Sequence, residues 1–304
     1  GEVNPSGHTV DTYARDFTKD PTYNNFGNNN VNNGNRYLED GKNRPYYFVE
    51  YEEGIYVGYR YWETAYAEIA AGRYNPDGYD TTDDVADADK WYADSVVYPL
   101  GHGLSYTTFE WELLNKEEIE STVLNQETDF SEAKINVKVR VTNTGDVAGK
   151  DVVQVYYNPP YEKGTTKIEK AAANLVGFAK TDLLKPGESQ IVQVQFVAQD
   201  MASFDSAGVN DKGHKGYVLE AGDYEISLRT DSHNIKQGKI NNDDDSVQPL
   251  VITRTVKDTI VCKTDLVTGA EIKPLFTGDY SSTNESLINN KISRATGLKQ
   301  PEPS

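Results

Sequence analysis

The chain has 304 residues, which suffices for two domains of ordinary size and excludes a single small module. It carries 48 acidic and 30 basic side chains, so its formal net charge is -18. A surface this negative repels phosphate backbones and anionic membranes, so we expect neither a nucleic-acid partner nor a membrane partner.

Targeting and redox features of the sequence are few. No stretch approaches the roughly 18–20 consecutive apolar residues that span a bilayer, and no basic segment with an apolar core opens the chain. We therefore expect a soluble protein, either cytoplasmic in a bacterium or secreted. Cys262 is the single cysteine, which excludes an internal disulfide and a cysteine metal cage. Because the chain opens at Gly1 and its one methionine is Met201, we also expect a fragment or a processed piece.

The first third of the chain changes character at residue 46. Residues 1–45 are poor in apolar side chains and rich in Asn, Gly and Asp, which predicts loop structure. A short strand is then predicted over residues 46–51 and a helix over residues 55–68. Four apolar side chains recur along this helix at spacings of four, three and four, so they should share one face: Ile55, Tyr59, Trp62 and Tyr66.

Residues 72–95 are rich in aspartate and poor in apolar side chains, which predicts an acidic surface loop. The aspartate spacing resembles a calcium loop only loosely, because the central glycine and the terminal glutamate are out of register. The four histidines are scattered without the spacing of metal ligands. We therefore expect no metal site and no cofactor.

From residue 107 onward the sequence alternates between apolar and polar side chains, as half-buried strands do. Ile135, Val137, Val139 and Val141 are one example. Further strands are predicted over residues 151–157, 174–178, 191–197, 222–229 and 250–256. This number and spacing of short strands predicts an antiparallel β-sandwich, with a corner at Tyr224 where the hydroxyl group pins the crossover between sheets.

Three segments resemble glycoside hydrolase family 3. Residues 98–109, YPLGHGLSYTTF, are similar to the signature that joins the α/β sandwich domain of that family to its fibronectin type III-like domain. Residues 51–61, YEEGIYVGYRY, and residues 3–11, VNPSGHTVD, resemble elements that precede the signature in the same order. The polar end of the chain also resembles members with a permuted domain order, in which a barrel follows.

The resemblance implies a mainly β fold with three parts. Residues 107–258 would form a fibronectin type III-like (immunoglobulin-like) β-sandwich. Residues 1–106 would be the C-terminal remnant of an α/β sandwich domain, and residues 259–304 a polar linker or tail.

The parent enzyme implied by the resemblance is a retaining β-glycosidase, most often a β-glucosidase, which uses two carboxyl groups about 5 Å apart. The nucleophile of the family is an aspartate in a Ser-Asp-Trp context, but the three tryptophans here follow Tyr61, Lys90 and Glu110. The acid/base glutamate of the family would lie upstream of Gly1. We therefore identify no catalytic residue. The implied partners are the missing barrel and upstream α/β half-domain, and a β-linked oligosaccharide bound through the parent.

Three residues are weak candidates for a supporting role beside the reacting groups: Glu53, Arg60 and His102. Glu50, Glu52 and Glu53 adjoin an aromatic cluster that could raise a carboxyl pKa by desolvation, although glutamates at such a turn also favour a helix N-terminus. Arg60 is expected to stack on neighbouring rings or to pair with Glu53 or Glu63. His102, between two glycines, fits a hydrogen-bonded hinge or a sugar contact.

Three functions remain open from the sequence. The first is a non-catalytic C-terminal portion of a retaining β-glycosidase that acts as a structural scaffold. The second is an independent carbohydrate-binding or adhesion module, because the 21 tyrosines could stack on sugars, although tyrosine also simply suits β-sheets. The third is a complete small glycosidase that draws its carboxylates from Glu50, Glu52 and Glu53.

Overall fold

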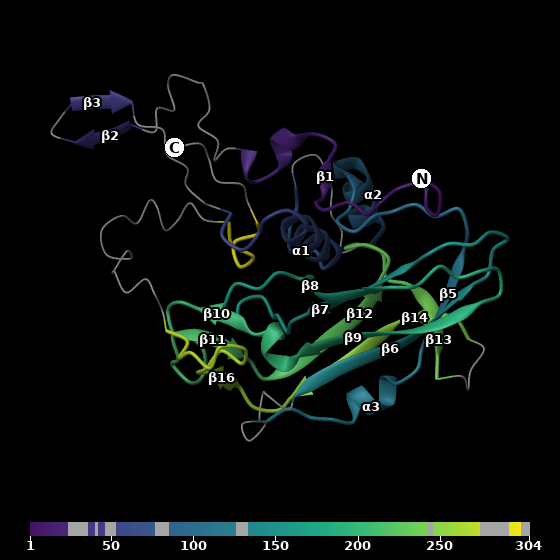
Figure 1. The fold of residues 1–304 in the computed structure, drawn as a ribbon. Helices are drawn as coiled ribbons and strands as arrows, with labels where there is room; N and C mark the ends of the chain where they lie inside the picture. Colours follow the sequence, from purple (N-terminus) through teal and green to yellow (C-terminus); the bar gives the residue numbers. More distant parts are fainter. Residues whose placement is uncertain are drawn as a thin grey trace. The chain divides into compact units, whose positions relative to one another are not determined.

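The computed structural model describes residues 1–23, 36–39, 42–45, 53–76, 85–125, 133–241, 246–273 and 292–298, with the backbone alone for residues 36–39 and 42–45. Two compact units make up the chain (Figure 1). The first unit combines Gly1–Asp11 with Tyr98–Leu275, and the second combines Thr12–Val97 with Phe276–Ser304. The strand predicted over residues 46–51 lies outside the described residues.

The first unit is built around two sheets. The four-stranded sheet has the order β15-β12-β7-β8, formed by Val251–Val256, Gly222–Arg229, Val152–Asn158 and Asn174–Lys180. The five-stranded sheet has the order β14-β13-β5-β6-β9, formed by Gln248–Pro249, Gln237–Ile240, Phe109–Leu113, Lys134–Asn143 and Ser189–Val197. Neighbouring strands run antiparallel, except that β13 runs parallel to β5. The predicted mainly β architecture is therefore confirmed.

Alternation along β6 and β9 builds the core between these sheets. The four predicted residues of β6 are all buried, and Val137 lies opposite Val194 on β9 while Val139 lies opposite Val192. Branched side chains at such cross-strand positions pack closely on a pleated surface. They form one buried cluster with side chains of β7 and β12, including Val153. A side chain every second residue thus supplies the core of the sandwich.

Smaller elements extend the first unit. Three short strands form a separate sheet in the order β10-β11-β16: Ser203–Asp205, Gly216–Leu219 and Ile260–Cys262. The helix α3, Lys116–Glu120, and the 3-10 helix η3, Ala198–Met201, lie in connections of the sandwich. Because β16 follows residue 258, paired strand structure continues beyond the predicted end of the sandwich; the domain limits themselves remain a prediction.

The second unit contains the helices α1, Tyr59–Ala70, and α2, Val85–Ser95. The remaining short elements are β1 (Tyr13–Ala14), η1 (Phe17–Lys19), β2 (Arg36–Glu39), β3 (Lys42–Pro45) and β4 (Val96–Tyr98). The strand β2 pairs with β3 in an antiparallel hairpin, and β1 pairs with β4. None of the described helices is long and apolar enough to cross a membrane.

The predicted helix over residues 55–68 begins four residues late and turns a different face inward. Gly58, at φ +56°, precedes its first residue, and Ile55 is left 42% exposed outside the helix. Trp62 is buried as predicted, but its buried apolar neighbours on the helix are Tyr61, Ala65 and Ile69. The predicted apolar face was therefore wrong in part, because tertiary contacts decide which side of an aromatic-rich helix is covered.

The prediction of an acidic surface loop over residues 72–95 was wrong for its second half, where α2 forms. Ala88, Trp91 and Tyr92 are buried, at the spacings of three and four that mark one helix face. Trp91 packs against Trp62 of α1, with ring centroids 5.7 Å apart. The aspartates on the exposed side dominate the composition and conceal this apolar stripe.

Candidate functional site

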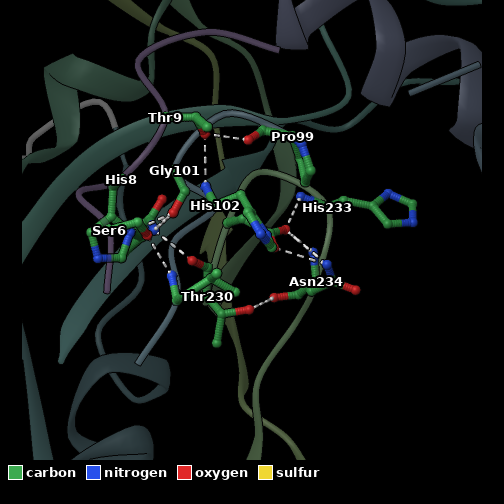
Figure 2. Close-up of polar contacts among 12 residues, drawn as sticks. Ser6, His8, Thr9, Pro99, Gly101, His102, Thr230, His233 and Asn234 are labelled. Carbon is green, nitrogen blue, oxygen red and sulfur yellow. Dashed lines mark hydrogen bonds and ion pairs between the residues drawn. The ribbon is translucent and has the colours of Figure 1, made fainter. Parts of the chain in front are cut away.

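The signature segment that includes His102 lies against the sandwich in the first unit. We call this site the junction cluster and define it as residues 6–9, 98–103 and 230–234 together with Gln154 (Figure 2). Its position depends on β7, whose side chains are buried on both faces of the sheet. Val153 and Val155 face the core, whereas Gln154 lies on the other face and is 4% exposed. The strand thereby places one buried amide where the three segments meet.

Gln154 ties two of the segments together. Its Nε2 donates hydrogen bonds to the carbonyl oxygens of Gly101, at 3.1 Å, and Thr230, at 2.6 Å. Gly101 adopts φ +81°, and a Cβ at this position would lie only 2.2 Å from Gln154 Oε1. Glycine is therefore required both for the left-handed backbone and for the close approach of the amide.

Residues 8 and 9 bind the same segment through main-chain atoms. Thr9 donates its hydroxyl to the carbonyl oxygen of Pro99 at 2.5 Å and accepts the amide N–H of His102 at 2.9 Å (Figure 2). The backbone of Thr9 exchanges two further bonds, with the N–H of Gly101 and the carbonyl of His102. His8 Nδ1 lies 2.6 Å from the carbonyl oxygen of Gly101. These bonds join parts of the chain about 90 residues apart.

His102 has an ionisable partner in the third segment. Its Nδ1 lies 3.9 Å from Asp231 Oδ2, and its ring stacks on Tyr98 with centroids 5.2 Å apart. The Asp231 carboxylate accepts hydrogen bonds from the backbone N–H groups of His233 and Asn234 and from the Asn234 side chain. The Asp231 carboxylate thus holds its own loop. Tyr98, the ring that stacks on His102, is 48% exposed.

The chemistry available to the junction cluster is limited by this geometry. It contains one carboxylate, Asp231, whereas retaining glycoside hydrolysis needs two carboxyl groups about 5 Å apart. The imidazole of His102 is half-buried and can donate or accept a hydrogen bond. The described residues of the cluster therefore do not by themselves supply the carboxyl pair of retaining glycoside hydrolysis.

Another carboxylate, that of the partly buried Asp151, lies directly before the first residue of β7. Asp151 accepts a 2.6 Å hydrogen bond from Trp111 Nε1 and a 2.9 Å bond from the backbone N–H of Val152. Burial raises the pKa of Asp151, although these hydrogen bonds oppose the shift. The Asp151 carboxylate holds the indole of Trp111, a fully buried core residue, so its role is structural.

The other two predicted site residues lie in the second unit. Glu53 is buried, and its carbonyl oxygen accepts the N–H of Tyr56. The guanidinium of Arg60 lies 5.7 Å from the ring centroid of Tyr59, so the expected stacking is present. The described residues include no ion pair of Arg60 with Glu53 or Glu63, and Glu63 instead accepts a 2.6 Å bond from the Tyr92 hydroxyl. Glu50 and Glu52 lie outside the described residues.

Sequence reasoning missed Gln154 and Asp231 as parts of the junction cluster. A polar residue inside a strand whose neighbours are apolar on both sides is the one local signal that could have indicated Gln154. Within the described part of the chain, no group of three or more His, Cys, Asp or Glu side chains is arranged to hold a metal ion.

Comparison with known proteins agrees with this architecture. A family model described as a fibronectin type III-like domain matches residues 151–232, which include β7, β8, β9 and β12. The chain therefore carries a fibronectin type III-like sandwich, and the predicted fold class is confirmed.

Three proteins that match this chain are described as β-glucosidases. Beta-glucosidase A of Butyrivibrio fibrisolvens is 36% identical over 234 residues, which cover 76% of this chain and 22% of that protein. The structure of a β-glucosidase from Paenibacillus barengoltzii matches with a TM-score of 0.54 and 32% identity, over 84% of this chain and 22% of that one. β-Glucosidase 3B from Thermotoga neapolitana, solved with α-D-glucose, matches with a TM-score of 0.53 and 30% identity, over 85% and 26% respectively.

These matches confirm the resemblance to glycoside hydrolase family 3 that residues 98–109 carry. The chain is a relative of glycoside hydrolase family 3 β-glucosidases and corresponds to one part of those larger multidomain proteins. It spans about a quarter or less of the length of each relative named above.

Proposed function

We propose that this chain is the non-catalytic C-terminal portion of a retaining β-glycosidase of the β-glucosidase type, where it acts as a structural scaffold for the catalytic domains. The observation that carries the proposal is the extent of the matches. Most of this chain aligns with β-glucosidases, yet it accounts for only 22% of the Butyrivibrio enzyme. The remaining domains of such an enzyme, a barrel and an upstream α/β half-domain, are the partners we propose.

Three buried carboxylates support a scaffold role, because each is already hydrogen-bonded within the protein. Glu68 is bound by two arginines, and Asp205 accepts backbone N–H groups and the amide of Asn210. Asp231 is held by its own loop in the same way. A nucleophile or general acid must instead present its carboxyl group to the substrate. In this proposal a β-linked oligosaccharide binds to the complete parent enzyme and not to this chain alone, and no cofactor takes part.

A domain exchange tests the proposal. The matched segment of the Butyrivibrio β-glucosidase A is replaced by this chain, and the chimera is compared with a deletion variant and with this chain alone. On aryl β-glucoside and aryl β-xyloside, we expect turnover by the chimera, none by the deletion variant and none by the isolated chain above a boiled control. Turnover by the isolated chain that is lost on Glu53→Gln would instead establish a complete small glycosidase.

A carbohydrate-binding or adhesion module is the second candidate, and exposed aromatic rings favour it. Tyr98 and Tyr106 are 48% and 56% exposed and lie eight residues apart in the signature segment. Such rings stack on the C–H faces of sugars. Retention of the isolated chain on immobilised β-glucan, lost in a Tyr98→Ala/Tyr106→Ala variant but not in Tyr217→Ala, would favour this module over the scaffold.

If the chain is a scaffold, we propose that His102 is a hydrogen-bonded hinge residue of the junction. We propose that Glu53 and Arg60 support the fold of the second unit. Their supporting contacts are the His102 stacking on Tyr98, the burial of Glu53 and the position of Arg60 over Tyr59.

A further inference from the structure

An arginine occupies an inward position of the edge strand β15. Side chains alternate along a strand, so Arg254 shares its face with Ile252 and Val256, both of which belong to the apolar core. It is 3% exposed and lies opposite Tyr224 of β12. A guanidinium at such a position must leave water, which is costly unless an anion compensates the charge.

The described residues do not supply that anion. Arg254 donates one hydrogen bond, from Nη1 to the carbonyl oxygen of Ile119 near the end of α3, while its Nε has no acceptor. Two acidic residues of α3 are paired elsewhere: Glu118 with Lys138 at 3.5 Å, and Glu120 with Lys116 at 3.2 Å. Burial accordingly lowers the pKa of Arg254, with no opposing contribution from a neighbouring charge.

Arg254 lines a cavity of about 270 Å³ between α3, the chain that follows it and the start of β6. Four buried side chains give the cavity apolar walls: Ile119, Leu124, Ala133 and Ile135. Asn136 and Glu118 also line it; among the described residues Asn136 Oδ1 has no hydrogen-bond donor, while its Nδ2 donates to Gln193. The exposed Lys134 adds a second positive charge at the rim.

We propose that this cavity binds a small organic carboxylate that also carries a hydrogen-bond donor, such as a hydroxy acid. A carboxylate in the cavity can pair with the guanidinium of Arg254 in a charge-assisted bond, which is the strong kind. A hydroxyl group on the same molecule can donate to Asn136 Oδ1, and a short hydrocarbon portion matches the apolar walls. The volume fits a small molecule rather than a peptide segment. This site is independent of the proposed glycosidase role.

Binding to the full chain at constant ionic strength tests the proposal. Isothermal titration and thermal unfolding are measured with lactate, with propionate, which lacks the hydroxyl group, and with lactamide, which lacks the charge. We expect lactate to bind and to raise the melting temperature, propionate to bind more weakly and lactamide to have no effect. No response to either carboxylate would overturn the proposal.

Substitutions then locate the site. Arg254→Met should weaken lactate binding about tenfold or more, as loss of a charge-assisted bond predicts, and should fold because an apolar side chain suits this face. Arg254→Lys, which keeps the charge but not the guanidinium, should bind with intermediate affinity and provides the readout if Arg254→Met does not fold. The matched control is Arg140→Met, which removes an arginine already paired with Glu112 and should leave lactate binding unchanged. Equal binding by wild type and both Arg254 variants would contradict the assignment.

The remaining source of a carboxylate is the protein itself. The connection between Asn125 and Ala133 contains Glu127, Asp129 and Glu132. A variant with the corresponding amides at these three positions should respond to lactate as wild type does. If lactate binds only after these substitutions, an acidic side chain of the chain occupies the site, and the proposal of a free ligand is wrong.

Discussion

Arg294 Nε donates a 2.7 Å hydrogen bond to Glu68 Oε1, although 226 residues separate the two in the chain. Glu68 is fully buried and also receives Arg73, through Nε and Nη2 at 2.7 Å each. Arg294 is itself 5% exposed. One carboxylate of α1 thus fastens a distant part of the sequence within the second unit.

We predict that Arg294→Met destabilises the second unit by about 3 kcal/mol, because removal of one partner leaves a buried charge less compensated. Urea unfolding followed by tryptophan fluorescence measures this, since Trp62 and Trp91 both lie in that unit. The control is Lys90→Met, which breaks an exposed pair with Asp94 and should change the free energy of unfolding by less than about 1 kcal/mol. Equal effects of the two substitutions would contradict the structural role of Arg294.

The same carboxylate predicts a pH dependence. Burial alone would raise the pKa of Glu68, but the hydrogen bonds from Arg73 and Arg294 outweigh it and hold the pKa below its ordinary value of 4.5. A depressed folded-state pKa stabilises the protein above the unfolded value, and this contribution is lost as the pH falls below it. We expect the difference in unfolding free energy between wild type and Glu68→Gln to be constant from pH 7 to about pH 5 and to shrink below about pH 4.5. A difference independent of pH down to pH 3 would contradict this.

The contact between Trp62 and Trp91 predicts that Trp62→Ala costs about 3–5 kcal/mol of stability, as is usual for truncation of a buried tryptophan. Ile55, placed on the same predicted helix face by the sequence but exposed in the structure, provides the comparison. Ile55→Ala should cost less than about 0.5 kcal/mol. Both are measured by urea unfolding, and a larger loss for Ile55→Ala than for Trp62→Ala would favour the sequence-based face.

The corner at Tyr224 predicts that Tyr224→Phe destabilises the sandwich by about 1–2 kcal/mol, because its buried hydroxyl donates to the carbonyl oxygen of Glu220 at 3.2 Å. Burial raises the pKa of Tyr224 well above its ordinary value, so the hydroxyl stays protonated and able to donate. Thermal unfolding checks the loss. Tyr217→Phe, at a 43% exposed ring, should leave the melting temperature unchanged, and a similar loss in both variants would count against the corner.

Two glycines with nearly equal backbone angles isolate the contact that holds the junction cluster. Gly101 and Gly187 have φ of +81° and +78°, but a Cβ at Gly187 meets no atom within 4 Å. Gly187→Ala should cost only the backbone strain of about 1–2 kcal/mol. Gly101→Ala should cost clearly more, because Gln154 must also move and lose its two hydrogen bonds. Urea unfolding compares the two, and equal losses would show that Gln154 does not hold this segment.

Local patterns were sufficient for the sandwich. The alternation of Ile135, Val137, Val139 and Val141 specifies a strand with one buried face, because the side-chain period of a strand is two regardless of its partners. The Tyr224 corner was likewise predictable, since its hydroxyl reaches a carbonyl only four residues upstream. The signature at residues 98–109 identified the resemblance to family 3 from the sequence alone, while the domain junction it predicts and the role of His102 stay predictions.

Elements that depend on distant partners were not predictable in this way. The apolar stripe of Ala88, Trp91 and Tyr92 was identified only from its burial in the structure. The contact of Trp91 with Trp62 also determines which side of α1 is buried. The apolar neighbours of Gln154 indicate a strand buried on both faces, but the partners of its amide, Gly101 and Thr230, are tens of residues away in the chain.

The sequence by itself therefore determined the sandwich and its Tyr224 corner, because strand alternation and the corner contact each involve only a few neighbouring residues. It also determined the relation of the chain to family 3 β-glucosidases, because a contiguous motif carries that relation. Tertiary structure alone decided the pairing of Glu68 with Arg294, the amide of Gln154 beside Gly101 and the buried guanidinium of Arg254. The physical reason is that a charged or polar side chain carries no local sign of burial. Its environment is set by residues brought close in space from tens to hundreds of positions away in the chain.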